Sequence, residues 1–273
     1  MQFSVLLSVY KNEKPEYLRL ALQSIAAQTL QPDEIVIVKD GGLTQALDAV
    51  IDDFAAKQQN VRVLPFAQNR GLGLALRDGV EACNYEYIAR MDTDDIALPD
   101  RFARQMAYLE QHQDIALLGS WITEFSQDAD KPDTITKLPC THEAILSYAK
   151  KRNPFRHMTV VFKKSAVITS GNYRDFLWFE DYDLWVRILQ QGYKVANMPE
   201  VLVNVRAGEE MFARRGGWRY LKQEVRFQRA LYERGFIGLE NYANNVFVRI
   251  AIRLVPNKVR IFVYKKILRR TVR

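Results

Sequence analysis

The sequence contains few of the features that build disulfide-rich, metal–thiolate or membrane-spanning proteins. Only two of its 273 residues are cysteines, Cys83 and Cys140, so we expect neither a disulfide framework nor a cysteine-based zinc site. No apolar run reaches 18 residues, so no transmembrane helix is predicted. The N-terminus runs straight into a strand-like segment without a basic region or a small-residue cleavage site, and we therefore predict no signal peptide. These absences predict a folded cytoplasmic protein.

Charge is distributed unevenly along the chain. The net charge is +7, but residues 206–273 contain 17 basic and 5 acidic residues and so carry +12. The first 205 residues therefore carry a net charge of −5. An acidic body with a basic tail predicts that the tail meets an anionic partner, either nucleic acid or the surface of an anionic membrane.

The first hundred residues alternate between short apolar runs and amphipathic stretches. The apolar runs predict buried strands, and leucine, isoleucine and alanine recur at helical spacing between them. Strands are predicted at 3–9, 34–38, 61–64 and 86–91, and helices at 15–28, 43–57 and from Gly71 to about Cys83. This alternation predicts an α/β fold with a mostly parallel sheet that is covered on both faces.

The second half is less regular. The patterns predict helices at 101–111 and 181–190, strands at 115–125, 159–162 and 194–205, a loop at 127–139, and helices from about Gly217 to the C-terminus. We expect a catalytic domain at 1–206 and a basic helical extension at 207–273.

Polar residues gather where the predicted strands of the first half end. Ligands of parallel sheets bind beyond these carboxyl ends. The polar residues at or near them are Ser8, Tyr10, Asp40, Asn69, Arg70, Asp92 and Asp94.

Three carboxylates lie within four residues, at Asp92, Asp94 and Asp95. Like charges that close repel one another unless a cation lies among them. A divalent ion with oxygen ligands suits such a cluster, and a diphosphate suits the remaining ligand positions of that ion. The alternative is an acidic turn that caps the following helix.

Several segments appear together in one order. They are 3–10, the strand end at Asp40, 69–71, 91–95 with 99–101, and 178–185. In this order they resemble a family 2 glycosyltransferase of the GT-A fold, an αβα sandwich. The resemblance covers residues 1–206 and is strongest to bacterial enzymes that build exopolysaccharide, capsule or O-antigen units, of the amylovoran-biosynthesis type.

The resemblance implies a nucleotide site at the first three strand ends. Ser8, Tyr10 and Asp40 would hold the base, since a tyrosine ring stacks on a pyrimidine and a carboxylate accepts its N3–H. Asn69 and Arg70 would contact the nucleotide from the start of a helix. Alternatively, Tyr10 packs in the core, Asp40 caps a turn and Asn69 caps the helix.

The resemblance also implies a metal site. Asp92 and Asp94 match the DxD motif of the family: Asp94 would bind Mg²⁺ or Mn²⁺, and Asp92 would contact the ribose or the water shell of the metal. Asp95 would share these roles or lie in the donor or acceptor pocket. Arg206 ends the last core strand, where some relatives place a basic group near the diphosphate.

The catalytic base is implied by a second motif. Asp181 matches the aspartate of the ED motif and would deprotonate the acceptor hydroxyl, and Glu180 would hydrogen-bond the acceptor or the donor sugar. His157, Trp178 and the loop 171–173 would line the sugar pocket. The alternative for Glu180 and Asp181 is electrostatic stabilisation of a helix N-terminus.

These implications predict an inverting, metal-dependent glycosyltransferase. It would move a sugar from a nucleotide-sugar, a UDP-sugar by preference, to a saccharide or a polyprenyl-diphosphate-linked acceptor. The basic segment 258–270 is imperfectly amphipathic and predicts peripheral contact with the inner face of the plasma membrane, or a helix packed on the core. No nucleic-acid partner is expected, because no recognition module accompanies the charge.

Two other functions are compatible with an α/β nucleotide fold. A sugar nucleotidyltransferase would need a glycine-rich loop after the first strand, and residues 8–14 contain no glycine. A non-catalytic membrane-binding protein with a degenerate site would not need the acidic motifs, which are intact.

Overall fold

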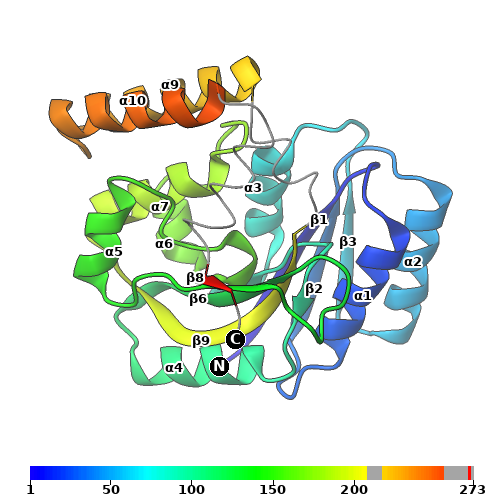
Figure 1. Cartoon of the computed structure of the whole chain (residues 1–273). Coiled ribbons are helices and arrows are strands. Elements are labelled where there is room, and N and C mark those ends of the chain that lie inside the picture. The colour runs from blue at the N-terminus through cyan, green and yellow to red at the C-terminus, as the bar shows by residue number, and fades with distance from the viewer. Residues whose placement is uncertain (208–216, 255–269, 272–273) are drawn as a thin grey trace.

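The strands of the described residues form one mixed β-sheet with helices on both faces (Figure 1). The structure is a computed structural model that describes residues 1–207, 217–254 and 270–271. The main strand order is β10-β7-β6-β8-β4-β1-β2-β3, and β9 pairs with β6 and β5. The strands are β1 (Phe3–Val9), β2 (Glu34–Lys39), β3 (Val61–Pro65), β4 (Tyr87–Arg90), β5 (Ile96–Ala97), β6 (Ile115–Phe125), β7 (Thr134–Thr136), β8 (Val161–Lys163), β9 (Lys194–Arg206) and β10 (Arg270–Thr271).

The parallel half of the sheet brings the predicted site residues to one edge. Strand β1 pairs in parallel with β2 and with β4, and β2 pairs in parallel with β3. All four strands therefore end on the same side. Strand β8 runs antiparallel to β4 and closes this half, so the loop after β4 lies near the middle of the sheet.

Helices cover the two faces because each presents an apolar stripe to the sheet. Helices α1, α2 and α4 pack in one core cluster, and α3, α5, α6, α7 and α9 pack in the other. The helices are α1 (Pro15–Ala26), α2 (Gln45–Lys57), α3 (Leu72–Ala82), α4 (Arg101–Gln111), α5 (His142–Ala149), the 3₁₀ turn η1 (His157–Thr159), α6 (Lys164–Thr169), α7 (Glu180–Gln190), α9 (Gly217–Glu233) and α10 (Leu239–Leu254).

Most of the predicted elements are confirmed, and several short ones were missed. Helices α5 and α6 were not predicted, and the predicted loop at 127–139 contains β7. Three residues between polar flanks give too short a pattern to indicate a strand. The expectation of helices to the C-terminus is wrong at β10, which pairs with β7; the rest of segment 258–270 lies outside the described residues.

The first helix of the C-terminal extension packs on the catalytic body. Phe227 of α9 is fully buried, with its ring 4.9 Å from that of Phe179 and 4.7 Å from that of Tyr182. Helix α10 lies beside α9 on the outside of the molecule (Figure 1). Among the described helices, none combines the length and the apolarity that crossing a bilayer requires.

Candidate active site

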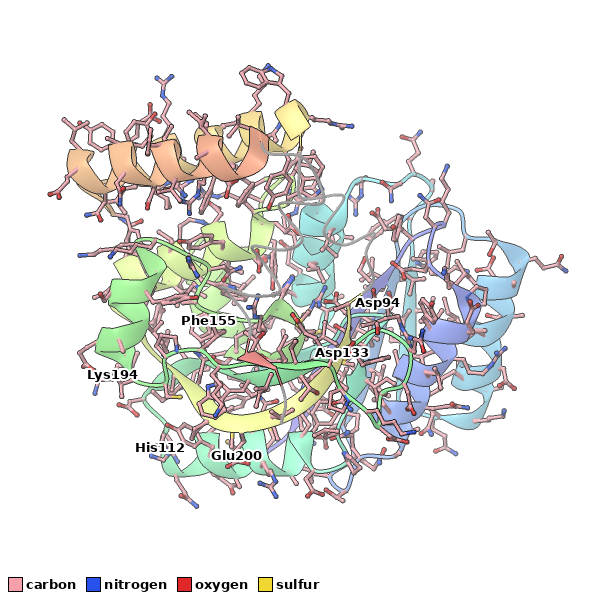
Figure 2. All side chains as sticks on the ribbon, in the orientation of Figure 1. Asp94, His112, Asp133, Phe155, Lys194 and Glu200 are labelled. Carbon is pink, nitrogen blue, oxygen red and sulfur yellow. The ribbon has the colours of Figure 1, made fainter. Side chains whose placement is uncertain are left out.

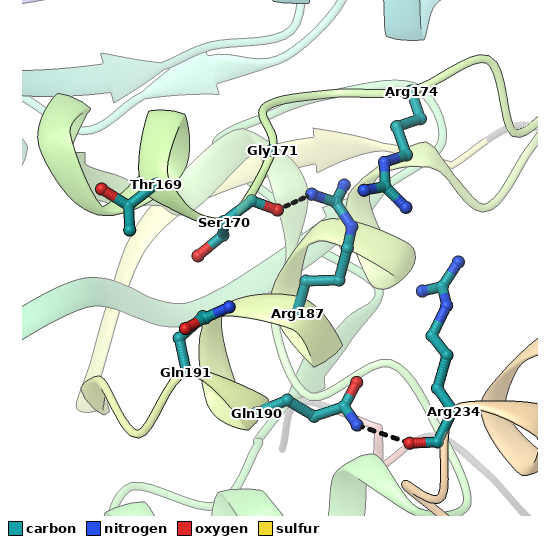
Figure 3. Close-up of a pocket in the computed structure, with 8 residues that line it drawn as sticks. All are labelled: Thr169, Ser170, Gly171, Arg174, Arg187, Gln190, Gln191 and Arg234. Atoms are coloured by element: carbon teal, nitrogen blue, oxygen red, sulfur yellow. Dashed lines mark hydrogen bonds between the residues drawn. The ribbon is translucent and has the colours of Figure 1, made fainter.

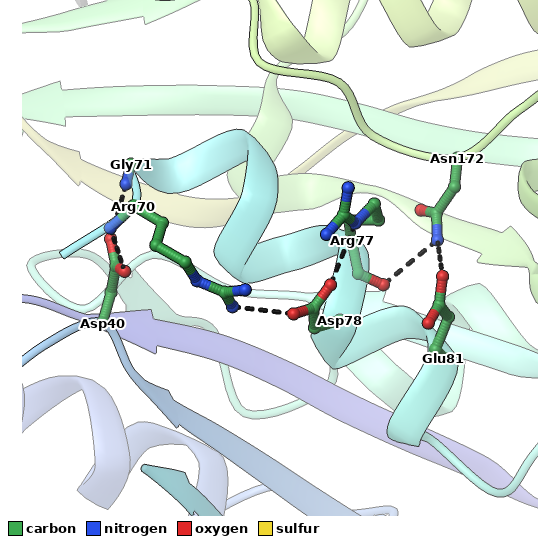
Figure 4. A network of polar contacts seen from close by, with 7 residues as sticks. All are labelled: Asp40, Arg70, Gly71, Arg77, Asp78, Glu81 and Asn172. Carbon is green, nitrogen blue, oxygen red and sulfur yellow. Dashed lines mark hydrogen bonds and ion pairs between the residues drawn. The ribbon is translucent and has the colours of Figure 1, made fainter. Parts of the chain in front are cut away.

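Asp40 organises the turn at the end of β3. Its buried carboxylate accepts hydrogen bonds from Asn69 Nδ2 (2.9 Å) and from the backbone N–H groups of Arg70 (2.8 Å) and Gly71 (3.0 Å) (Figure 4). A carboxylate offers about four lone-pair positions, so three donors leave room for one more. The nucleotide-site residues predicted from β2 and β3 are therefore brought together, and Asp40 has a structural task in addition to the predicted one.

Arg70 is held on the outer side of the same turn. Its Nη2 donates to Asp78 at 2.7 Å, and its guanidinium lies 3.8 Å from the ring centroid of Phe66 (Figure 4). Ser8 and Tyr10, both half-buried, lie at the end of β1, beside the β2 end that carries Asp40.

The three aspartates after β4 form one cluster. One carboxylate oxygen from each of Asp92, Asp94 and Asp95 lies within 4.8 Å of the others, and only Asp95 is fully buried. Burial raises the pKa of Asp95 well above its usual value, and repulsion from Asp94 and then Asp92 adds to this. Figure 2 shows Asp94 on the side of the molecule away from His112. The three neighbouring carboxylates give this part of the site an excess of negative charge.

Two arginines hold this cluster in place. Arg90, only 2% exposed, forms an ion pair with Asp92. Arg206 donates its backbone N–H to Asp95 Oδ1 (2.8 Å) and its Nε to the Asp94 carbonyl oxygen (3.3 Å). The Arg206 guanidinium lies 3.9 Å from the Tyr17 ring centroid, so β9 and α1 both anchor the acidic turn.

Glu180 and Asp181 begin α7 on the other side of the site. Asp181 accepts hydrogen bonds from Asn153 Nδ2 (2.7 Å) and from the Tyr182 backbone N–H (2.6 Å). Burial raises the pKa of Asp181, and these two donors oppose the increase. Burial, followed by repulsion from Asp181, raises the pKa of Glu180 to about 8. Both carboxylates also interact electrostatically with Arg90, which therefore links the two acidic groups.

The N-terminus of α3 packs directly against Glu180. A Cβ added at Gly73 would lie 3.2 Å from Glu180 Cβ and would collide with the backbone carbonyl oxygen of Arg174. The nucleotide-side helix and the helix that carries Asp181 are thus in contact, and both motifs face one site.

The chain matches the family model described as "Glycosyl transferase family 2" over residues 4–170, which is more than half of its length. It belongs to glycosyltransferase family 2. The resemblance predicted from the sequence is confirmed, and the nucleotidyltransferase and non-catalytic alternatives find no support.

Two relatives of this family 2 transferase align with it over nearly their whole length. It is 45% identical to the amylovoran biosynthesis glycosyltransferase AmsE of Erwinia amylovora, over 97% of this chain and 98% of the relative. It is 36% identical to a UDP-Gal:alpha-D-GlcNAc-diphosphoundecaprenol beta-1,3-galactosyltransferase of Escherichia coli, over 98% and 97%. The similarity to exopolysaccharide-type enzymes is therefore confirmed.

Solved structures confirm the fold of the transferase. The S. aureus TarS fragment 1–349, solved with UDP-GlcNAc, superposes with a TM-score of 0.62 at 15% identity, covering 95% of this chain and 69% of the fragment. At this identity the similarity establishes the fold alone, which is the GT-A arrangement that the sequence predicted.

Two predicted pocket residues of the transferase contact aromatic side chains of the protein. His157 is buried, with Nε2 at 2.9 Å from Tyr173 Oη; burial and then Arg90 lower its pKa well below the usual value. Trp178, with φ of 67°, packs on Tyr220 of α9 with ring centroids 5.1 Å apart. Whether either residue contacts a sugar stays a prediction.

Sequence reasoning missed Arg90 and Asn153. Arg90 follows three residues of a buried strand, and a charged residue at a core position is rare unless it is paired. That rarity was the available signal. Asn153 precedes a proline in an irregular segment, and nothing in the sequence distinguishes it.

Proposed function

We propose that this transferase is an inverting, metal-dependent enzyme of bacterial surface-polysaccharide biosynthesis. It takes a sugar from a UDP-sugar and adds it to a saccharide carried on a polyprenyl diphosphate. The observation that carries the proposal is the convergence of two acidic groups, Asp92–Asp95 and Glu180–Asp181, on the buried guanidinium of Arg90. The named activity of the Escherichia coli relative supports the choice of donor and acceptor.

The donor nucleotide is assigned to the ends of β1, β2 and β3. The free lone-pair position of Asp40 is suited to the N3–H of a uracil, and Tyr10 lies beside it at the end of β1. The turn that Asp40 holds presents the N-terminus of α3, where backbone N–H groups favour an anion. These contacts would orient the nucleotide so that its diphosphate faces the aspartate cluster.

The aspartate cluster is suited to Mg²⁺ or Mn²⁺. Hard divalent ions prefer carboxylate oxygens, and the charges of Asp94 and Asp92 add to the effect of burial in raising the pKa of Asp95. Asp94 and Asp92 are the ligands, and the buried Asp95 supports them through its bond to Arg206. When bound, the ion supplies Lewis-acid stabilisation of the diphosphate leaving group.

Asp181 is assigned as the base. Each of its two oxygens accepts one hydrogen bond, so each retains a lone pair for the acceptor hydroxyl. Its raised pKa makes it a stronger base than an exposed aspartate. Asn153 and the Tyr182 N–H fix the direction of the carboxylate, and Glu180, with a pKa of about 8, holds a proton at neutral pH and donates a hydrogen bond to a sugar oxygen.

Peripheral membrane contact would bring the enzyme to a lipid-linked acceptor at the cytoplasmic face. Helix α10 exposes Phe247 (72%), Val248 and Ile250, and α9 exposes Trp218 (73%). Residues 206–273 carry a net charge of +12, which complements an anionic lipid surface. Exposed apolar side chains within a basic segment are typical of helices that lie in the membrane interface.

A thermal-shift screen with UDP-, GDP- and dTDP-sugars, with and without Mn²⁺, tests the donor site. We expect stabilisation by UDP-sugars that requires Mn²⁺ and is lost in Asp94→Ala. Asp128→Ala is the matched control, because Asp128 is an exposed aspartate whose ion-pair partner, Lys131, lies at 3.9 Å. Stabilisation that persists in Asp94→Ala, or that needs no metal, would contradict the assignment.

A further inference from the structure

A second pocket lies at the C-terminal half of α7. It has a volume of about 450 Å³, within the range of small-molecule sites, and is formed where the end of α6, the last turns of α7 and the residue after α9 meet (Figure 3). Three of its lining residues are arginines: Arg174, Arg187 and Arg234. Neither the aspartate cluster nor the base belongs to it.

The positive charge of this arginine pocket is only partly balanced. Asp183, fully buried, accepts from Arg187 Nε at 3.0 Å and from Arg234 Nη1 at 2.6 Å. Two guanidinium groups thus share one carboxylate, and no carboxylate among the described residues pairs with Arg174. Burial lowers the pKa of Arg187 to about 10; Asp183 opposes this, and Arg174 and Arg234 add to it by repulsion.

The guanidinium groups converge on one small space. A Cβ added at Gly171 would lie 3.0 Å from Arg174 Nη2 and 3.4 Å from Arg187 Nη1, so both groups border the same point. Figure 3 shows Arg234 directed toward them from the opposite wall. An anion at this position would meet donors from three elements.

Unused donors line the pocket. Arg187 uses one N–H on each terminal nitrogen for the carbonyl oxygens of Ser170 and Asn172, which leaves one free on each. Ser170, 5% exposed, has a buried hydroxyl with no hydrogen-bond partner among the residues that the structure describes. A buried hydroxyl without a partner is costly, and a ligand oxygen would satisfy it.

We propose that Arg174, Arg187, Arg234 and Ser170 form a binding site for a phosphate or diphosphate ester. Compact anions with several oxygens suit guanidinium donors, which bind phosphate oxygens in pairs. A pocket of about 450 Å³ is many times larger than one water molecule, which occupies roughly 30 Å³ in the liquid, so it has room for more than a single phosphate. The source of the anion is either the headgroup of a lipid diphosphate or a soluble phosphate ester.

The site lies on the helix that carries the base. Arg187 is six residues after Asp181, about 9 Å along the helix axis. If the acceptor is a lipid diphosphate, as proposed above, its diphosphate would bind here while its sugar reaches Asp181; that part rests on the proposed function. Binding of the anion itself does not.

Calorimetric titration of inorganic diphosphate and of phosphate, with EDTA present, tests the site. We expect saturable one-to-one binding that is at least tenfold weaker in Arg174→Gln and in Arg234→Gln. Arg174 has no ion pair among the described residues, so its variant should fold normally. Arg229→Gln, which removes an exposed arginine of α9 paired with Glu233, is the matched control and should bind like the wild type.

Asp94→Ala separates this proposal from the donor site. It should bind diphosphate in EDTA as the wild type does, whereas loss of binding in this variant would place the anion at the aspartate cluster and overturn the proposal. Absence of saturable binding, or equal binding by Arg174→Gln, would also overturn it. Phosphatidylcholine vesicles with and without polyprenyl diphosphate identify the source: competition with free diphosphate assigns a lipid headgroup, and no competition assigns a soluble ester.

Discussion

Replacing Gly41 with alanine should disrupt the turn at residues 69–71, which Asp40 holds, while leaving the aspartate cluster intact. Gly41 has φ of 89°, where an L-residue costs about 1–2 kcal/mol. Its added Cβ would also lie 2.6 Å from the Asn69 backbone nitrogen, about 0.9 Å inside an ordinary non-bonded separation of roughly 3.5 Å. Relief requires the 69–71 turn to move away from Asp40, and such overpacking costs about 1–3 kcal/mol.

We therefore expect the free energy of unfolding of Gly41→Ala to fall by about 2–5 kcal/mol, and its affinity for a UDP-sugar to fall by at least tenfold. Gly42→Ala is the matched control, because a Cβ there meets no atom within 4 Å. Urea denaturation and calorimetric titration of the nucleotide measure both effects. If Gly41→Ala bound the nucleotide as tightly as Gly42→Ala, the argument that Asp40 and the turn form the donor site would be wrong.

Three further predictions concern the base, its neighbour and the outer helix. Asp181→Asn should reduce transfer at least 10³-fold in a radiolabelled-sugar assay while keeping metal-dependent nucleotide binding; normal turnover would refute the base assignment. The pKa of Glu180 is raised from 4.5 to about 8, so between these values the folded state holds a proton that the unfolded state has lost, and stability falls as pH rises. The free energy of unfolding of the metal-free wild type, measured by urea denaturation, should therefore fall between about pH 5 and 8 relative to that of Glu180→Gln. Parallel pH profiles of the two proteins would contradict the raised pKa. Phe247→Asp should weaken pelleting with anionic vesicles severalfold. The fold should stay intact, because Phe247 is exposed and Arg249 of the same helix still donates a hydrogen bond to the Lys151 carbonyl oxygen. Unchanged pelleting would exclude α10 as the membrane contact.

The parallel half of the fold was predictable because its signals are local. Strands β1, β2 and β4 are short and largely apolar, and Tyr10, Asp40 and Asp92 follow their ends within two residues. Parallel pairing then places Tyr10, Asp40 and Asp92 at one edge without further information. The three aspartates are close in sequence, so their mutual repulsion needs no tertiary structure to be recognised.

The rest of the site depends on contacts between distant segments. Asn153 reaches Asp181 across 28 residues, and Arg206 reaches Asp95 across 111. No periodicity or spacing encodes such pairs. The identity of Asp181 as a candidate base came from the resemblance of its motif to a family, because a helix that begins with acidic residues has an adequate explanation in its own dipole.

The charge balance of the site explains why a cation is needed in the proposed function. Asp92, Asp95, Glu180 and Asp181 all interact with Arg90, and Asp92 and Asp95 also interact with the buried Arg101, so two guanidinium charges face four carboxylates. Burial, followed by repulsion from neighbouring carboxylates, raises the pKa values of Asp95 and Glu180, and a raised pKa favours the protonated, uncharged form. A divalent ion at the aspartates would lower the pKa of Asp95 by offsetting the charges of Asp94 and Asp92, while burial and Asp181 keep the pKa of Glu180 raised. Asp92 also contributes to the raised pKa of Asp181, so a cation at the aspartates would lower the pKa of the proposed base on the acceptor side.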